Sequence, residues 1–193
     1  MVETLIDTFE ELKKYIFIIN RNDKDIIIVK FQNSNFYHLV GLHKIKNFDN
    51  YFPNYIKSKD KQYKYIKKNT KKFNNILENQ LKEKDTLSLR VKTFSNILDL
   101  LKNNNASLYN LKPKTPYSLY DGDYGLMKMY EKDICCLLGL KVDEKNNNTT
   151  NCIPNSWMAS KRINKLVEFK RPIFIKNISY IPMSLYNPDE ILF

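Results

Sequence analysis

Hydrophobic positions recur every three to four residues in two segments of the chain, and this spacing predicts two amphipathic helices. The first covers residues 2–16, where acids and lysines separate the apolar side chains. The second covers residues 85–102. Its apolar positions fall on one narrow stripe at about 100° per residue, and they are Leu87, Val91, Phe94, Leu98 and Leu101. Three asparagines at 103–105 mark its end.

Three other segments have different patterns. Residues 25–31 (DIIIVKF) form a short, β-branched run, which predicts a strand. Residues 35–43 are apolar with two histidines, and we expect a helical turn packed on a sheet. Residues 49–82 mix aromatic and aliphatic side chains with many lysines, which predicts one or two basic helices.

After residue 105 the hydrophobic runs become short, and Pro, Gly, Asp or Asn residues separate them. This pattern is typical of an antiparallel sheet. The runs cover residues 107–109, 119–120, 124–129, 134–142, 153–158 and 172–180. We therefore expect an α+β fold with N-terminal helices packed on a C-terminal antiparallel meander sheet of about four to five strands. The whole chain, residues 1–193, is expected to be one domain with a basic helical insert at about 49–82.

The charge of the chain is unevenly distributed. Its 32 Lys and Arg against 21 Asp and Glu give a net charge of +11 and a pI near 9.4. Residues 57–72 hold eight lysines and one aspartate, a net charge of +7, and residues 161–176 reach +5. Such clustering favours a nucleic-acid partner. The alternatives are a solvated helix face and the Lys- and Asn-rich composition that AT-rich genomes produce.

The two basic windows supply the predicted contacts to nucleic acid. The expected phosphate-binding residues are Lys57, Lys61, Lys64, Lys67, Lys68, Lys71 and Arg162. Tyr55, Tyr63 and Tyr65 interleave with the first window, as aromatic residues do where bases stack.

Composition also excludes several classes of function. The four glycines cannot form a phosphate-binding loop or a dinucleotide-binding fingerprint. The three cysteines lack zinc-site spacing, so we expect buried, reduced thiols and neither a metal nor a cofactor. The acidic N-terminal segment does not resemble a signal peptide, and no run of about 18 apolar residues predicts a membrane span. A cytoplasmic location without a membrane partner is expected.

His38 and His43 are the two histidines of the chain. A separation of five residues on a helix turns two side chains about 140° apart. They can share one cleft only if Gly41 breaks the helix between them. A histidine titrates near neutral pH and is therefore a natural proton shuttle. The alternative for His38 is a core residue with satisfied hydrogen bonds.

Arg90 and Ser156 are the other candidates for chemistry. Arg90 lies at the edge of the apolar stripe, from which its guanidinium can emerge at a cleft and clamp a phosphate. The alternative is an arginine paired with a carboxylate. Ser156 follows a polar loop at 143–151, near a strand start, where its hydroxyl can donate to a phosphate oxygen. Its alternative is an ordinary turn residue.

Residues 25–181 resemble the phage- and mobile-element-encoded nuclease-like domains of the Barnase/EndoU/colicin/RelE class. The segment NFYHLVGL at 35–42 follows a strand and is similar to the family's F-x-H-L-x-G-[IL] pattern. Residues 88–101 resemble the family helix, with one basic residue ahead of an apolar repeat. The final strands include a family-like Pro-x-Ser. Val40 stands where the family often has a hydroxyl residue, so no side-chain donor is expected there.

The resemblance implies a metal-independent endoribonuclease that acts as a toxin or in a phage–host conflict. RNA would be cleaved by attack of the ribose 2′-OH. By this resemblance His38 is the general base or acid, Arg90 stabilises the phosphorane, and Ser156 holds a non-bridging oxygen. RNA is the expected partner, and an antitoxin or host protein is a further candidate. The alternative is a non-catalytic nucleic-acid-binding or protein-binding counter-defence or regulatory protein on the same fold.

Overall fold

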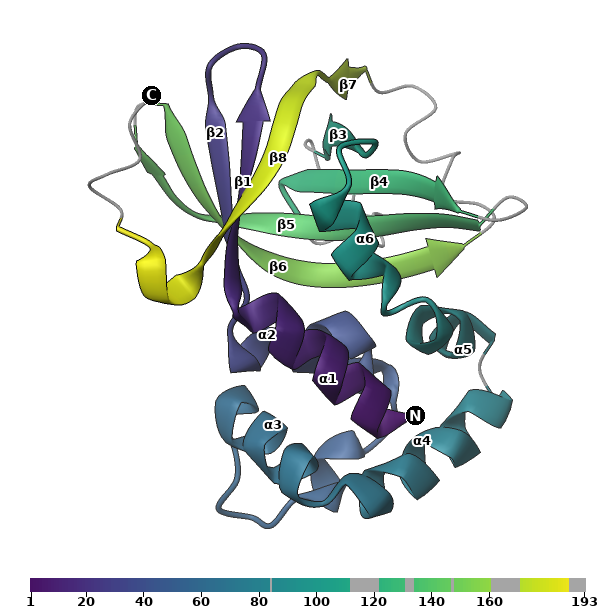
Figure 1. Ribbon diagram of the computed structural model, residues 1–193. Helices are drawn as coiled ribbons and strands as arrows, with labels where there is room; N and C mark the ends of the chain where they lie inside the picture. Colours follow the sequence, from purple (N-terminus) through teal and green to yellow (C-terminus); the bar gives the residue numbers. More distant parts are fainter. Residues whose placement is uncertain (84, 112–121, 131–133, 147, 161–170, 188–193) are drawn as a thin grey trace.

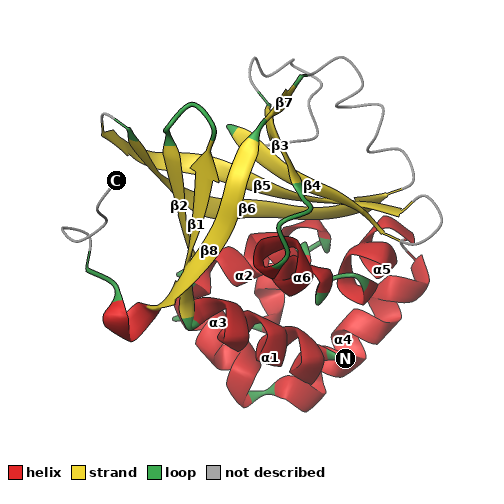
Figure 2. Ribbon diagram, turned by 45° about the horizontal axis from the view of Figure 1, so that its top comes forward, coloured by secondary structure: helices red, strands yellow, loops and turns green. Residues whose placement is uncertain are grey.

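The computed structural model describes residues 1–83, 85–111, 122–130, 134–146, 148–160 and 171–187. Its α-helices are α1 (Val2–Lys13), α2 (Asn33–Val40), α3 (Lys59–Lys68), α4 (Thr70–Glu83), α5 (Asp85–Lys92) and α6 (Asn96–Lys102). Its strands are β1 (Tyr15–Arg21), β2 (Ile26–Lys30), β3 (Ser107–Asn110), β4 (Tyr124–Tyr130), β5 (Ile134–Asn146), β6 (Thr149–Ser160), β7 (Pro172–Ile173) and β8 (Ile175–Pro182). The helices lie against one face of a curled sheet (Figures 1 and 2). The expected α+β class is confirmed.

The sheet is larger than expected, and it is mixed. The described residues form eight strands in the order β7-β3-β4-β5-β6-β2-β1-β8, so the expectation of four to five antiparallel strands is wrong. β2 runs parallel to β6, and each of the other neighbouring pairs is antiparallel. The additional strands come from the N-terminal half, because β1 and β2 form a hairpin that joins β6 to β8.

The N-terminal hairpin explains the main error in the helix prediction. The first helix ends at Lys13 rather than at residue 16, and β1 begins at Tyr15. Four of the β1 side chains are buried in succession, because one sheet face packs on the helices and the other on a second apolar cluster. A continuously apolar strand of this kind lacks the alternation that distinguishes a strand from a buried helix end.

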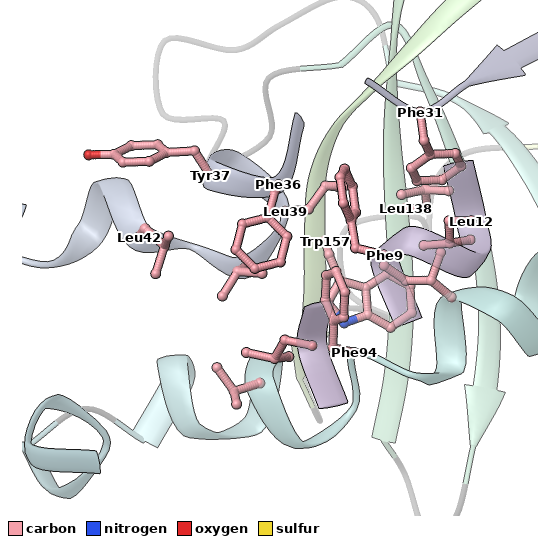
Figure 3. Packing of buried hydrophobic residues seen from close by; sticks show 14 of the residues in the cluster. Phe9, Leu12, Phe31, Phe36, Tyr37, Leu39, Leu42, Phe94, Leu138 and Trp157 are labelled. Atoms are coloured by element: carbon pink, nitrogen blue, oxygen red, sulfur yellow. The ribbon is translucent and has the colours of Figure 1, made fainter. Parts of the chain in front are cut away.

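One cluster of buried residues spans the helices and the inner face of the sheet. Trp157 on β6 and the rings of Phe9, Phe36 and Phe94 meet at its centre (Figure 3). The Trp157 indole nitrogen donates to the Thr93 hydroxyl at 3.3 Å, between α5 and α6. All three cysteines are buried free thiols, as expected.

The apolar stripe of residues 85–102 is confirmed, but it runs over two helices instead of one. Leu87, Val91, Phe94 and Leu101 are buried, and Leu98 is partly buried against them. The break lies at residues 93–95. The Thr93 hydroxyl there donates to the Leu89 carbonyl oxygen at 2.8 Å, a bond that often bends a helix.

Candidate functional site

The site forms at the C-terminal end of α2. This helix begins with a capping box in which Gln32 and Asn35 exchange hydrogen bonds between side chain and backbone. It ends at Gly41, whose φ of +88° lies in the left-handed region. The Gly41 N–H donates to the His38 carbonyl oxygen at 3.2 Å. A glycine in this conformation is a common helix stop, because it turns the chain without steric cost.

This turn brings the two histidines together. His38 lies in the last turn of α2, and His43 lies in the 3₁₀-helix Leu42–Lys44 that follows Gly41. Their ring centroids are 5.1 Å apart and their planes are tilted by 39°. The sequence predicts that the two histidines meet only if the helix ends at Gly41, and α2 does end there. His38 and His43 therefore present two imidazoles to one small region.

Arg90 contacts the backbone at the end of α2 and is buried instead of emerging at a cleft. Its side chain comes from α5 and is only 4% exposed, and its Nη1 donates to the His38 carbonyl oxygen at 3.2 Å. That carbonyl belongs to the negative end of the α2 dipole, which compensates in part for the buried charge. The carboxylate partner that sequence reasoning offered as an alternative does not occur among the ion pairs of the described residues.

The electrostatics of the pair follow from these neighbours. Partial loss of hydration, aided by the positive groups of His38, Arg90 and Lys44, lowers the pKa of His43 to about 4. Burial lowers the pKa of Arg90 to about 10, so it stays protonated at neutral pH. His43 is therefore neutral at pH 7, beside a permanent buried cation.

Tyr37 and Asp49 connect the histidines to the basic segment, and sequence reasoning missed both roles. The Tyr37 ring centroid lies 6.5 Å from that of His43, and its hydroxyl donates to Asp49 Oδ1 at 3.1 Å. The same oxygen accepts from Lys59 at 3.2 Å and from Gln62 at 3.0 Å. The Tyr37 hydroxyl points away from the packed rings (Figure 3). These bonds hold the start of α3 next to the histidine pair.

The predicted phosphate-binding lysines of the first window lie in the described part of the chain. All six are exposed and lie on α3, on α4 or just before α3. We call them the basic helical surface: Lys57, Lys61, Lys64, Lys67, Lys68 and Lys71. Lys64 pairs with Asp60 at 2.8 Å and Lys67 with Glu10 at 3.3 Å. Arg162 lies outside the described residues, as does most of the second basic window.

Only one of the three interleaved tyrosines has the exposure that base stacking needs. Tyr55 is 78% exposed, whereas Tyr63 is 2% exposed and packs on Phe9 and Phe36. Tyr65 is half-buried beside Phe73. The expectation that Tyr63 meets a base is therefore wrong, because α3 turns that side chain toward the core.

The structure does not bring Ser156 to His38 and Arg90. Successive strand residues face opposite sides of a sheet, and Trp157 faces the helices. Ser156 therefore faces the other side, where its buried hydroxyl lies against Gly139 of β5. Its Oγ atom has no hydrogen-bond partner among the described residues. A side chain at position 139 would collide with it.

Among the described residues, no helix is long and apolar enough to cross a membrane. A family model described as phage-Barnase-EndoU-ColicinE5/D-RelE like nuclease4 matches residues 7–178 of the chain. No curated protein and no solved structure gives a significant match.

Proposed function

Because the chain belongs to this family of phage Barnase-EndoU-ColicinE5/D-RelE-like nucleases, we propose that it is a metal-independent endoribonuclease whose catalytic residues are His38 and His43. The observation that carries the proposal is the pair of imidazoles with centroids 5.1 Å apart. Two histidines, one acting as base and one as acid, can supply both proton transfers of RNA cleavage.

The proposed reaction assigns one proton transfer to each ring. Neutral His43 accepts the proton of the ribose 2′-OH while the 2′ oxygen attacks the adjacent phosphorus. The bond between phosphorus and the 5′ oxygen breaks, and protonated His38 donates a proton to that leaving oxygen. The products are a 2′,3′-cyclic phosphate and a 5′-hydroxyl. The lowered pKa of His43 is the reason for assigning it the role of base.

Arg90 is a positioning residue in this proposal, because a side chain 4% exposed cannot grip a phosphate directly. Its bond to the His38 carbonyl oxygen holds the end of α2. Its charge adds a positive potential where the phosphorane gains negative charge, and such preorganised charge acts without contact. Ser156, on the other sheet face, has no part in the reaction.

RNA would reach the pair across the basic helical surface. Asp49 bonds both Tyr37, whose ring centroid lies 6.5 Å from that of His43, and Lys59, the first residue of α3, so α3 begins near the histidine pair. Contacts to phosphates would position the strand, and exposed Tyr55 would stack on one base.

The proposal is tested by inducible expression together with cleavage by purified protein. Expression of the wild-type protein should arrest growth, and the purified protein should fragment RNA in the presence of EDTA. His38→Ala and His43→Ala should do neither. Lys92→Gln is the control, because Lys92 is exposed on the same helix as Arg90. RNA binding without cleavage by the wild-type protein would favour the non-catalytic alternative. Cleavage that EDTA abolishes would contradict metal independence.

A further inference from the structure

A cleft lies on the sheet face opposite the helices, apart from the histidine pair. Its volume is about 1090 Å³, and residues of β1, β8 and the β1–β2 turn line it together with Asn148, which precedes β6. Two backbone hydrogen bonds join the segments around the cleft. The Asn22 N–H donates to the Phe174 carbonyl oxygen at 3.0 Å, and the Ile26 N–H donates to the Asn148 carbonyl oxygen at 2.8 Å.

The charged residues of the cleft favour an anionic ligand. Arg21, Lys24 and Lys176 line it, against one acid, Asp25. Asp25 lies 3.3 Å from the Arg21 guanidinium, and Asp23 also pairs with Arg21. The two exposed lysines are in no ion pair among the described residues, so their charge is available to a ligand.

The uncharged residues of the cleft match a base better than a bare phosphate. Asn20 Nδ2 donates to Asn177 Oδ1 at 2.7 Å across the two strands. The Asn20 carbonyl oxygen and the Asn177 NH₂ group take no part in this bond. They provide an acceptor beside a donor, and such a pair can bind the edge of a base. Ile18, Ile26 and Ile181 give the cleft an apolar lining, which suits the flat face of a base.

We propose that this cleft binds a single-stranded stretch of RNA, with Lys24 and Lys176 on phosphates and the Asn20–Asn177 pair on a base. Pockets for drug-sized ligands are about 300–1,000 Å³, so the cleft has room for at least one nucleotide. A rigid A-form duplex keeps its base edges paired and cannot place a base there. The inference rests on RNA being the substrate, but it concerns a second surface and predicts binding rather than cleavage.

The test uses the cleavage-defective His38→Ala chain, so that binding is measured without reaction. Fluorescence anisotropy compares this chain with one that also carries Lys24→Asn and Lys176→Gln. Asparagine is chosen because the backbone at position 24 has a φ of +70°, which asparagine tolerates. Lys92→Gln is the charge control. We expect the double change to weaken single-stranded RNA binding about tenfold and to reduce the salt slope by about 1.4, at about 0.7 per phosphate contact.

A second variant tests recognition of the base. Asn20→Ala with Asn177→Ala should weaken single-stranded binding without changing the salt slope, because it removes no charge. A duplex of the same sequence should lose less than about twofold in affinity with either double variant. Unchanged single-stranded binding in the lysine variant overturns the inference. An equal loss for duplex RNA overturns its single-stranded specificity. Neither result bears on cleavage, which the histidine variants test separately.

Discussion

Replacing Gly41 by alanine should disrupt the histidine pair while leaving both histidines in the sequence. Gly41 has a φ of +88°, and a Cβ atom there would lie 2.8 Å from Arg90 Nη1 and 3.2 Å from Leu87 Cδ1. The left-handed backbone costs a non-glycine residue about 1–2 kcal/mol. Crowding in a packed region adds about 1–3 kcal/mol. The free energy of unfolding should therefore fall by about 2–5 kcal/mol.

Urea unfolding measures the loss of stability, and single-turnover cleavage measures the loss of activity at a temperature where the variant stays folded. Cleavage should fall at least about tenfold, because either Arg90 or the turn after α2 must move and the two rings then separate. A double-mutant cycle with Arg90→Lys isolates the contact with Nη1, since lysine lacks that atom, while the contacts with Cδ and with Leu87 and the backbone strain remain. Wild-type stability and wild-type cleavage in Gly41→Ala would refute the reasoning.

Three further predictions concern Arg90, Tyr55 and the basic helical surface. Arg90→Met should slow cleavage about 10–100-fold and move the acid limb of the pH–rate profile upward, because His43 loses a cation that helps to hold its pKa near 4; an unmoved limb would contradict this coupling. Tyr55→Ala should weaken RNA binding by about 1–3 kcal/mol with little change in the rate of the bound complex, and equal affinity would show that no base stacks there. Lys68→Gln with Lys71→Gln should reduce the salt slope of single-stranded RNA binding by about 1.4, whereas an unchanged slope would place the phosphates elsewhere.

The sequence predicted the elements that have either a helical period or a short β-branched run between turn residues. The stripe from Leu87 to Leu101 and the β-branched segment at 25–31 are in this group. It missed β1, because this apolar run follows α1 almost directly, and a strand buried on both faces has no polar alternation that separates it from the helix. It also missed the parallel pairing of β2 with β6, because that contact joins residues more than 100 positions apart and leaves no local trace.

The candidate site shows the same division between local and distant information. Gly41 between His38 and His43 was a local signal, and the break that it allows was foreseeable. The burial of Arg90 could not be foreseen, because a position at the edge of a helical stripe fits both a cleft and a buried place against the end of α2. The bond from Tyr37 to Asp49 spans only 12 residues, yet neither residue belonged to a pattern that indicated chemistry.

The most direct test of the central claim is the single-turnover rate of RNA cleavage for the wild-type chain, His38→Ala, His43→Ala and the double variant, with analysis of the product ends. A positioned acid or base contributes about 10²–10⁴-fold, so each single variant should lose a factor in this range. The double variant should lose little more than the worse single variant, because the two rings act in one reaction. The wild-type product should end in a 2′,3′-cyclic phosphate. Wild-type rates in either single variant, or a 5′-phosphate product, would contradict the proposed histidine pair.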